Sequence, residues 1–525
     1  QTISHLHKTT KVNMLTKVYA AAIQGISAIP VTIEVNALRG IQFYLVGLPD
    51  SAVKESYHRI QSAFQHNGLK FPSKKIIVNM APADIRKEGS AYDLPIAIGI
   101  LAASDVIVAD RLSRFLIMGE LGLDGNLMPI KGALPIAIKA RELGYEGFIL
   151  PSQNAREAAV VNNLKVYGVD NIVQVIRFLN GEDTLAPTIV NTREEFFSQQ
   201  NHFEFDFSDV KGQENVKRAF EVAAAGSHNI ILVGPPGSGK SMMAKRLPSI
   251  LPPLSLSESL ETTKIHSVAG RLGKDASLVA IRPFRSPHHT ISSVALVGGG
   301  SNPQPGEISL AHNGVLFCDE LPEFNRSVLE VLRQPLEDRH ITIARAKYSI
   351  TYPANFMLVA SMNPCPCGYY NHPTKACVCN PGQVQKYLNK ISGPLLDRID
   401  IQVEITPVPF EELSKSTTSE NSAVIRERVM RARQIQEKRF ENELDVHCNA
   451  QMTPRLLQQY AVLDQRGKAL LENAMDRLNL SARAYDRILK VARTIADLDG
   501  SEMIQSMHIA EAIGYRSLDR ENWGA

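Results

Sequence analysis

The chain has little of what marks secreted or membrane proteins. Six cysteines in 525 residues do not make a disulfide framework, so a reducing compartment is the default. No apolar run is long enough to cross a bilayer, since the longest, residues 94–108, is interrupted by Pro95, Ser104 and Asp105. No secretory signal is evident. These absences predict a cytoplasmic protein with no membrane partner.

An excess of charge of one sign is also missing. The chain has 57 Lys and Arg against 54 Asp and Glu, a net charge of +3. This balance permits a nucleic-acid partner but does not argue for one, so any DNA contact needs a local basic surface. Repeats of solenoid length are absent as well, and the length predicts two to four globular domains.

Composition and apolar periodicity divide the chain into five segments. Residues 1–13 precede the first methionine and are expected to be a cloning remnant outside the fold. Residues 14–180 mix strands and helices, 181–206 are polar and predict a linker, 207–405 alternate strands and helices as a parallel α/β sheet does, and 406–525 are helical. The expected strands include 31–35 and 75–79, and the expected helices are 94–103, 134–143, 213–225, 422–442, 454–478, 483–497 and 507–517.

The most specific motif follows the apolar run 229–233 and precedes a helical stretch. It fits G-x-x-x-x-G-K-[ST], the phosphate-binding P-loop, in the strand–loop–helix context that this motif requires. Glycines let backbone N–H groups turn around a phosphate, Lys240 would reach the β- and γ-phosphates, and the Ser241 hydroxyl would ligate Mg²⁺. The eight residues are Gly234, Pro235, Pro236, Gly237, Ser238, Gly239, Lys240 and Ser241. They predict ATP and Mg²⁺ as cofactors.

Acidic residues end a second apolar strand, residues 315–318. Asp319 can hold Mg²⁺ through water, and Glu320 can orient and polarise the attacking water, the pattern of a Walker B motif. Many strands end in acids, but the position beyond the P-loop strengthens the signal. The alternative for Glu320 is an acid favoured by a helix N-terminus.

Two further residues suit an ATP-hydrolysing site. Asn363 ends the apolar strand 356–362, where a polar side chain can reach the γ-phosphate, the sensor-1 position. Arg398, between Asp397 and Asp400, could enter a neighbouring subunit's site as an arginine finger. The alternative is a surface ion-pair network, which contributes little.

Four of the six cysteines fall within fifteen residues. Cys365, Cys367, Cys377 and Cys379 give C-x-C-x₉-C-x-C, which predicts a tetrahedral Zn²⁺ site on a loop, with His372 as a possible substitute ligand. A metal-stapled loop that directly follows Asn363 would lock the sensor strand and help present Arg398. Reduced thiols without metal are the alternative.

Several segments together carry a family resemblance, namely 207–213, the P-loop, 282–290, 305–312 and 363–368. With these, nearly the whole chain resembles the magnesium-chelatase-like AAA+ ATPases, and most closely their competence-associated members. The resemblance implies an AAA+ α/β core with a C-terminal helical lid. It also implies a homo-hexameric, ATP-driven helicase that promotes branch migration in natural transformation, with single-stranded and branched DNA and a recombinase as partners.

The same resemblance supplies residue roles. It places the phosphate and Mg²⁺ ligands at the P-loop, the Walker B acids at 319–320, sensor 1 at Asn363 and the arginine finger at Arg398. In the lid it makes Arg483 the sensor-2 candidate, with Arg487 and Arg493 as alternatives.

Candidate DNA contacts lie in two segments. Arg282 and Arg285, near His288 and His289, precede the Walker B strand, and Arg345 and Lys347 lie in an expected β-hairpin, residues 341–351. Related helicases line their pore with such hairpins, whose basic residues would follow phosphates without reading sequence. The alternatives are solvated hairpin residues and, for the histidines, structural hydrogen bonds.

The N-terminal half resembles a Lon-protease α+β domain around residues 85–94, 119–125 and 129–134. Ala91 occupies the position of the nucleophilic serine and Leu134 that of the lysine, so the Ser–Lys dyad is missing. Ser90 and Lys131 are close enough in sequence that a register error could restore it. We therefore expect a DNA-binding or assembly ring instead of a protease. The competing function for the whole chain is the motor subunit of a metal-chelatase complex.

Overall fold

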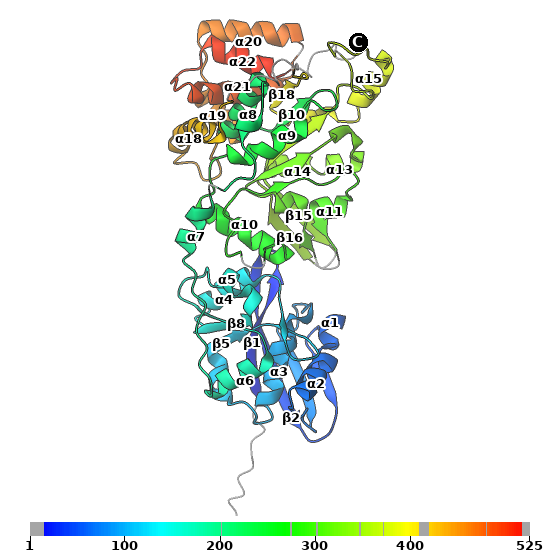
Figure 1. The fold of residues 1–525 in the computed structure, drawn as a ribbon, viewed down its shortest axis with the longest axis vertical. Coiled ribbons are helices and arrows are strands. Elements are labelled where there is room, and N and C mark those ends of the chain that lie inside the picture. Colours follow the sequence, from blue (N-terminus) through cyan, green and yellow to red (C-terminus); the bar gives the residue numbers. More distant parts are fainter. Residues whose placement is uncertain are drawn as a thin grey trace, which may run out of the picture. The chain divides into compact units, whose positions relative to one another are not determined.

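The computed structural model describes residues 15–200, 202–273, 276–300, 303–345, 348–370, 372–408, 419–478 and 480–516 (Figure 1). The expected cloning remnant, 1–13, lies outside these residues. The chain forms two compact units, and unit 1 combines the residues up to Ser198 with Ser259–Val279. Unit 2 combines Gln199–Glu258 with the residues from Ala280 onward. Ser259–Val279 lie within residues 207–405, the segment that the sequence predicts to be the ATPase core.

Unit 1 is built on a mixed sheet of seven strands in the order β3-β4-β2-β1-β5-β8-β9. β1 pairs antiparallel with β2 and β2 with β4, and the other neighbours are parallel. The strands are β1 (Thr16–Gln24), β2 (Ser27–Leu38), β3 (Phe43–Val46), β4 (Lys75–Ala81), β5 (Phe115–Ile117), β8 (Gly147–Pro151) and β9 (Lys165–Val169). A small pair, β6 (Glu120–Leu121) and β7 (Leu127–Met128), lies outside this sheet.

Helix α3 (Asp93–Ala102) forms the core of unit 1. All ten of its residues are buried, as expected for a helix that is apolar all round. Gly99 allows the close approach, because a Cβ there would lie 2.6 Å from a Val35 methyl carbon. The other helices of the unit are α1 (Ser51–Lys54), α2 (Ser56–His66), α4 (Ala133–Glu142), α5 (Ser152–Ala158), α6 (Ile172–Asn180) and α7 (Thr192–Gln199), which falls within the expected linker.

Unit 2 contains a parallel five-stranded sheet in the order β11-β14-β17-β10-β18. β10, β14 and β17 are entirely buried, which explains their continuous apolar sequences. The strands are β10 (Ile230–Val233), β11 (Phe284–Arg285), β14 (Val315–Cys318), β17 (Met357–Met362) and β18 (Ile401–Glu404). Parallel pairing brings the carboxyl ends of β14, β17 and β10 to one edge of the sheet.

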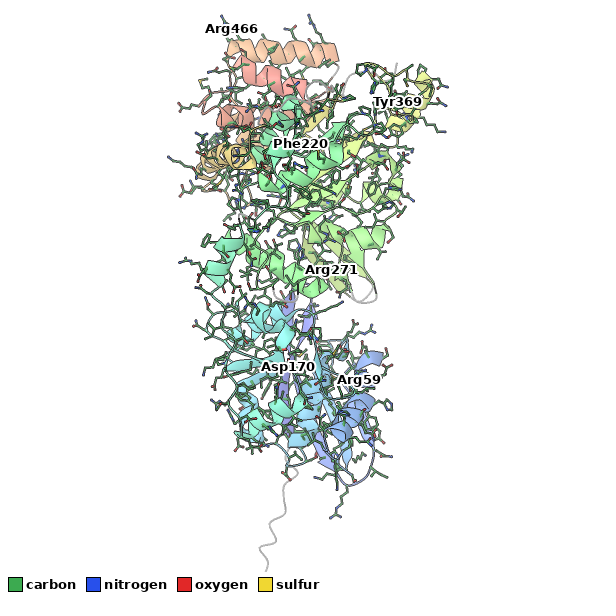
Figure 2. The ribbon with its side chains drawn as sticks, in the orientation of Figure 1. Arg59, Asp170, Phe220, Arg271, Tyr369 and Arg466 are labelled. Carbon is green, nitrogen blue, oxygen red and sulfur yellow. The ribbon has the colours of Figure 1, made fainter. Side chains whose placement is uncertain are left out.

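Short helices and two hairpins accompany this sheet. The expected hairpin is present as β15 (His340–Arg345) paired with β16 (Tyr348–Pro353), and a smaller one joins β12 (Gly298–Gly299) to β13 (Gln304–Pro305). The helices are α8 (Glu214–Gly226), α9 (Lys240–Arg246), α11 (Ser293–Val297), α12 (Glu307–Leu310), α13 (Arg326–Glu330), α14 (Arg333–Asp338), α15 (Pro381–Leu388) and α16 (Gly393–Leu396). Helix α10 (Leu256–Ala269) begins in unit 2 and belongs to unit 1 from Ser259 onward. On α8, Phe220 is fully buried in the core (Figure 2).

The C-terminal helices pack into the same apolar core as the parallel sheet. They are α18 (Ser422–Arg439), α19 (Pro454–Tyr460), α20 (Gln465–Leu478), α21 (Ala482–Leu498) and α22 (Ser506–Gly514). The single helix expected at 454–478 is two helices, because Asp464 accepts a hydrogen bond from the Gly467 amide (2.6 Å) at the start of α20. Within the described ranges, none of the helices combines the length and apolar character that a membrane crossing requires.

Candidate nucleotide site

The P-loop leaves β10 and enters α9 as a glycine-dependent turn. Gly237 and Gly239 have φ values of +78° and +91°, which residues with a Cβ rarely adopt. Gly234 is required for a different reason, since a Cβ there would lie 2.5 Å from the Ile405 carbonyl oxygen. The amide of Gly234 donates to the Met362 carbonyl (3.1 Å), so the loop begins beside the end of β17.

Lys240 is the central cation of this edge. Its ammonium donates to the carbonyls of Gly234 (2.7 Å) and Pro235 (2.9 Å) and to Oδ1 of Asn363 (3.2 Å). Burial lowers the pKa of Lys240, while the nearby carboxylates of Asp319 and Glu320 oppose that shift. The proposed sensor-1 residue therefore lies within hydrogen-bond distance of the phosphate-binding lysine.

The two Walker B acids are held from a neighbouring strand. The Ser241 hydroxyl donates to Oδ2 of Asp319 (2.7 Å), and the Ser361 hydroxyl donates to Oδ1 of the same carboxylate. The Glu320 amide donates to the Ser361 hydroxyl oxygen (3.1 Å). Glu320 itself has φ +53°, an uncommon backbone conformation for a residue with a side chain.

The edge thus joins one ammonium, two hydroxyls, one amide and two carboxylates. Hydroxyl and carboxylate oxygens are the ligands that Mg²⁺ prefers, and Ser241 and Asp319 already lie in contact. The P-loop amides and Lys240 suit phosphate oxygens. Ser361 was not singled out from sequence, because a serine inside an apolar strand is ordinary. Its position two residues before Asn363 was the only signal.

Arg398, the finger candidate, is 8% exposed in this single copy. Its guanidinium forms an ion pair with Glu337 and donates to the Pro394 carbonyl. Burial lowers the pKa of Arg398, and Glu337 opposes that shift. Reaching a neighbouring subunit would require Arg398 to exchange Glu337 for a new anionic partner.

The three sensor-2 candidates on α21 differ in their partners. Arg487 pairs with buried Asp400 (3.0 Å), and Arg493 is 3% exposed and pairs with Asp497. Arg483 has a side chain that is 67% exposed and makes a longer contact with Asp397 (3.5 Å). Of the three, Arg483 would lose the weakest ion pair on contacting a phosphate, which favours Arg483 as the sensor-2 residue.

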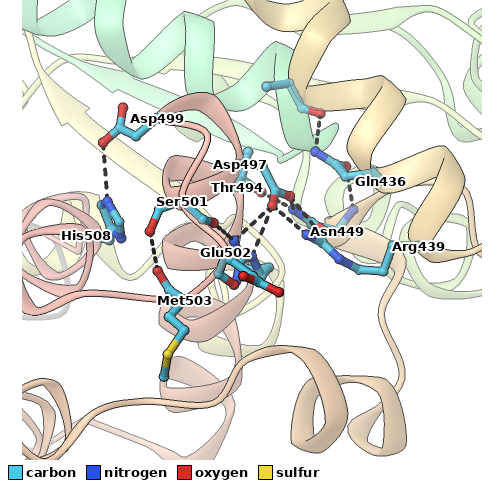
Figure 3. A network of polar contacts seen from close by, with 12 residues as sticks. Gln436, Arg439, Asn449, Thr494, Asp497, Asp499, Ser501, Glu502, Met503 and His508 are labelled. Atoms are coloured by element: carbon cyan, nitrogen blue, oxygen red, sulfur yellow. Dashed lines mark hydrogen bonds and ion pairs between the residues drawn. The ribbon is translucent and has the colours of Figure 1, made fainter.

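A polar network explains why Arg493 is structural (Figure 3). Asp497 accepts hydrogen bonds from Arg439 (2.6 and 2.7 Å) and Asn449 (2.8 Å), in addition to Arg493 (3.1 Å). Figure 3 shows Arg439, Asn449 and Asp497 pointing toward one another from separate segments. Removing one partner would leave a buried charge unpaired, so this network holds the C-terminal helices together.

The cysteine cluster assembles as the spacing predicted. Sγ atoms of Cys365, Cys367 and Cys377 lie 3.3 to 3.7 Å apart, and all four ligand atoms including Cys379 lie within 4.8 Å of one another. A tetrahedral zinc site with Zn–S bonds of about 2.3 Å has S–S edges of about 3.8 Å, so the four thiols fit the ion. His372 uses Nδ1 to accept from the Thr374 amide (3.2 Å).

Of the four residues predicted to contact DNA, the structure describes the side chains of Arg282 and Arg285, and both form ion pairs. Arg282 donates to the carbonyls of Pro252 (2.6 Å) and Asn313 (2.8 Å) and pairs with Glu258. A contact with DNA would require Arg282 to leave these partners inside unit 2. Arg285 forms a bidentate pair with Glu307 (2.6 and 2.7 Å). The Arg345 side chain and Lys347 lie outside the described residues.

Histidines 288 and 289 belong to the same segment. Their rings lie 4.1 Å apart between centroids, and Nδ1 of His288 contacts the Thr290 hydroxyl (2.8 Å). In the described part of the chain, the four cysteines are the only group of three or more side chains placed to share a metal ion, which favours structural hydrogen bonds for these histidines.

Positions 91 and 134 of unit 1, where the Lon resemblance would place a catalytic serine and lysine, carry Ala91 and Leu134. Leu134 is fully buried, and its amide donates to the Glu157 carboxylate (2.9 Å). Ala91 offers its carbonyl to the Gly119 amide (2.8 Å) and has no hydroxyl. Lys131 is exposed, and its side-chain carbons lie beside Gly270, where an added Cβ would be 3.0 to 3.4 Å from them.

Three family models cover most of the chain. "Magnesium chelatase, subunit ChlI" matches residues 206–413, "Subunit ChlI of Mg-chelatase" matches 33–154, and "Magnesium chelatase, subunit ChlI C-terminal" matches 419–516. The first includes the P-loop, Asp319, Glu320, Asn363 and Arg398, and the third includes the three arginine candidates on α21.

Full-length relatives are similar along the whole chain. Competence protein ComM of Haemophilus influenzae is 45% identical over 96% of this chain and 97% of its own length. The protein YifB of Escherichia coli is 44% identical over 96% and 98%. The magnesium-chelatase 38 kDa subunit of Rhodobacter capsulatus is 27% identical over 30% of this chain and 50% of its own.

Proposed function

Because the chain belongs to the ComM/YifB family of magnesium-chelatase-like AAA+ ATPases, we propose that it is a cytoplasmic, ATP-driven DNA translocase. In this proposal a homo-hexamer promotes branch migration of recombination joints during natural transformation. The observation that carries it is the meeting of Lys240, Ser241, Asp319 and Asn363 at one sheet edge, in a relative of a competence protein.

In the proposed reaction each polar side chain has one task. Lys240 and the P-loop amides bind the phosphates, and Ser241 and Asp319 hold Mg²⁺, which neutralises charge that develops on the phosphates. Glu320 orients and polarises the attacking water, and Asn363 positions that water and the γ-phosphate. Arg483 contacts phosphate from the lid.

Arg398 acts in trans in this proposal. An arginine finger stabilises transition-state charge and contributes about 10³- to 10⁵-fold in rate. Mixing Arg398→Ala with Lys240→Ala tests the sharing of sites, because each variant lacks what the other can supply. Recovery of ATP hydrolysis in the mixture, with neither variant active alone, is the expected result. A mixture as inactive as its components would contradict the trans role.

DNA contact is assigned to the hairpin β15–β16 and to Arg282 and Arg285. Arg345 and Lys347 would follow phosphates, which makes the binding salt-dependent and insensitive to sequence. Arg285 would have to leave Glu307 to take part. A recombinase that supplies the joint is the expected protein partner.

The proposal includes a structural zinc ion. Cys365, Cys367, Cys377 and Cys379 are its ligands, on the basis of the thiol distances. The ion is a fold-stabilising group here and takes no part in phosphoryl transfer.

The test of the function is strand displacement from a three-stranded DNA junction. We expect wild-type protein with ATP and Mg²⁺ to displace the third strand and Lys240→Ala to leave the junction intact. Lys245→Ala is the matched control, since Lys245 is exposed on the same helix α9. An intact junction with wild-type protein that hydrolyses ATP would contradict the proposal.

The second candidate function is the motor of a metal-chelatase complex. The match to the magnesium-chelatase 38 kDa subunit over 179 residues favours a shared motor core. This candidate predicts ATP hydrolysis without DNA binding at low salt, and thus the opposite outcome in a simple binding assay.

A further inference from the structure

The loop that carries the four cysteines begins at Asn363, and the helix that follows the loop packs close to the same residue. It leaves β17 at Asn363, and Cys365, two residues later, is fully buried. After Cys379 the chain forms α15, whose buried Tyr387 lies close enough to the Asn363 backbone amide for that amide to oppose the rise in the Tyr387 pKa that burial causes. Both ends of this segment, residues 363–388, therefore meet at the residue that contacts Lys240.

The middle of the same segment lies against the P-loop. Gly368 has φ +84°, and a Cβ at this position would lie 2.6 Å from Cδ and 3.0 Å from Cγ of Pro236. Tyr369 follows it (Figure 2), and the Tyr370 amide donates to the sulfur of Cys365 (3.3 Å). The backbone of the cysteine loop thus forms one wall of the phosphate-binding turn.

The described part of this wall has no regular secondary structure. Residues 363–370 and 372–380 contain no helix or strand, and Val378 is 83% exposed. A loop of this kind has a high conformational entropy unless it is cross-linked. Four convergent thiolates around one ion provide such a cross-link.

We infer that zinc bound by Cys365, Cys367, Cys377 and Cys379 sets the nucleotide affinity by holding Gly368 against Pro236 and Asn363 against Lys240. The inference rests on the proposed ATP site. The metal thus helps to form the nucleotide pocket within one subunit. Loss of the metal separates the cysteine loop from the P-loop.

The test compares zinc content and the affinity for a fluorescent ATP analogue in the full chain. We expect about one zinc ion per wild-type chain. The double variant Cys377→Ser/Cys379→Ser should lose the ion and bind the analogue about 10- to 100-fold more weakly, the scale on which small misplacements affect such sites. Stripping wild-type protein with a chelator under reducing conditions should weaken binding equally, and zinc should restore it.

A glycine variant distinguishes the effect of the loop contact with Pro236 from the effect of zinc binding itself. Gly368→Ala should keep its zinc and still bind the analogue more weakly, because the new Cβ clashes with Pro236. Gly144→Ala is the matched control, since Gly144 has φ +77° but no atom within 4 Å of an added Cβ. It carries the same backbone strain without the clash, so its affinity should equal that of wild type.

The outcomes are distinct. Metal-free wild-type protein, unchanged affinity after zinc loss, or equal affinities of Gly368→Ala and Gly144→Ala would each overturn the inference. If the double serine variant does not fold, the chelator experiment and the comparison of Gly368→Ala with Gly144→Ala still test the inference. Failure of wild-type, zinc-loaded protein to bind the analogue would instead reject the proposed ATP site.

Discussion

Unit 1 and unit 2 differ at the positions where the sequence resemblances place catalytic residues. In unit 2, Asp319 and Asn363 follow buried strands, and Lys240 begins helix α9. Lys240 donates a hydrogen bond to Asn363, and Ser241 donates one to Asp319. In unit 1, the corresponding positions carry Ala91 and a fully buried Leu134. Burying polar groups costs free energy unless they are paired, so a chain keeps them where they act. This difference agrees with the proposal that unit 2 hydrolyses ATP and that unit 1 serves binding or assembly.

The largest effect should follow from removing one carboxylate of unit 2. Glu320→Gln should still bind ATP, because the phosphate ligands are untouched, but should hydrolyse it about 10²- to 10⁴-fold more slowly for want of a general base. Single-turnover hydrolysis measures this. Glu323→Gln is the control, an exposed acid of the same segment paired with Lys390 (3.3 Å), and should act like wild type. Equal rates for both variants would assign Glu320 to helix capping.

Two buried carboxyls extend the comparison to stability. Burial alone would raise the pKa of Asp400, but Arg487 and His228 hold it well below its ordinary value. Asp400 therefore stabilises the fold above about pH 4, and this contribution is lost as the pH falls through that range. Asp400→Asn should cost about 3 to 5 kcal/mol near pH 7 by leaving Arg487 unpaired.

Glu157 in unit 1 should show the opposite sign. Burial raises the pKa of Glu157, although Ser267, the Leu134 amide and Asn154 lower it in part. The folded state thus binds this proton more tightly, and stability falls as the pH rises above the ordinary value of about 4.5. Glu157→Gln should be more favourable relative to wild type near pH 8 than near pH 4.5. Chemical unfolding of both variants across pH checks the two signs, and parallel pH trends would contradict them.

A smaller effect is expected from the hydroxyl that links the Walker B acids. Ser361→Ala removes one hydrogen bond to Asp319 and one from the Glu320 amide, which should cost about 1 to 2 kcal/mol of transition-state stabilisation, or roughly tenfold in rate. If Ser361 positions the acids, the Mg²⁺ concentration for half-maximal activity should rise as well. A slower enzyme with an unchanged Mg²⁺ requirement would indicate general destabilisation.

The smallest effect tests unit 1 directly. Ser90→Ala should change neither ATP hydrolysis nor strand displacement, and wild-type protein should cleave no unfolded substrate such as casein. Ser90 is only partly buried and lies beside Ala91, the position of the missing nucleophile. Proteolysis that Ser90→Ala abolishes would break the comparison between the units.

Local patterns predicted the elements well. Helices expected at 213–225 and 483–497 are α8 (Glu214–Gly226) and α21 (Ala482–Leu498), because periodicity and capping residues act over short distances. The P-loop turn and the approach of Asn363 to Lys240 also follow from local sequence once the parallel strands are in order.

Long-range contacts account for what sequence reasoning missed. Arg282 resembled a surface cation, but its partners come from Pro252, Glu258 and Asn313, which no local pattern connects to it. Ser361 gains its role from Asp319 on the adjacent strand. The same reason applies to Ser259–Val279, whose grouping with unit 1 depends on packing.

The account depends most on ATP hydrolysis in unit 2 being used to move DNA. Its most direct test is the steady-state hydrolysis rate of wild-type protein with and without single-stranded DNA at low salt. We predict a several-fold higher rate with DNA, a higher rate at subunit concentrations that favour assembly, and no hydrolysis by Lys240→Ala. The same rate with and without DNA would contradict the account and favour a chelatase-type motor.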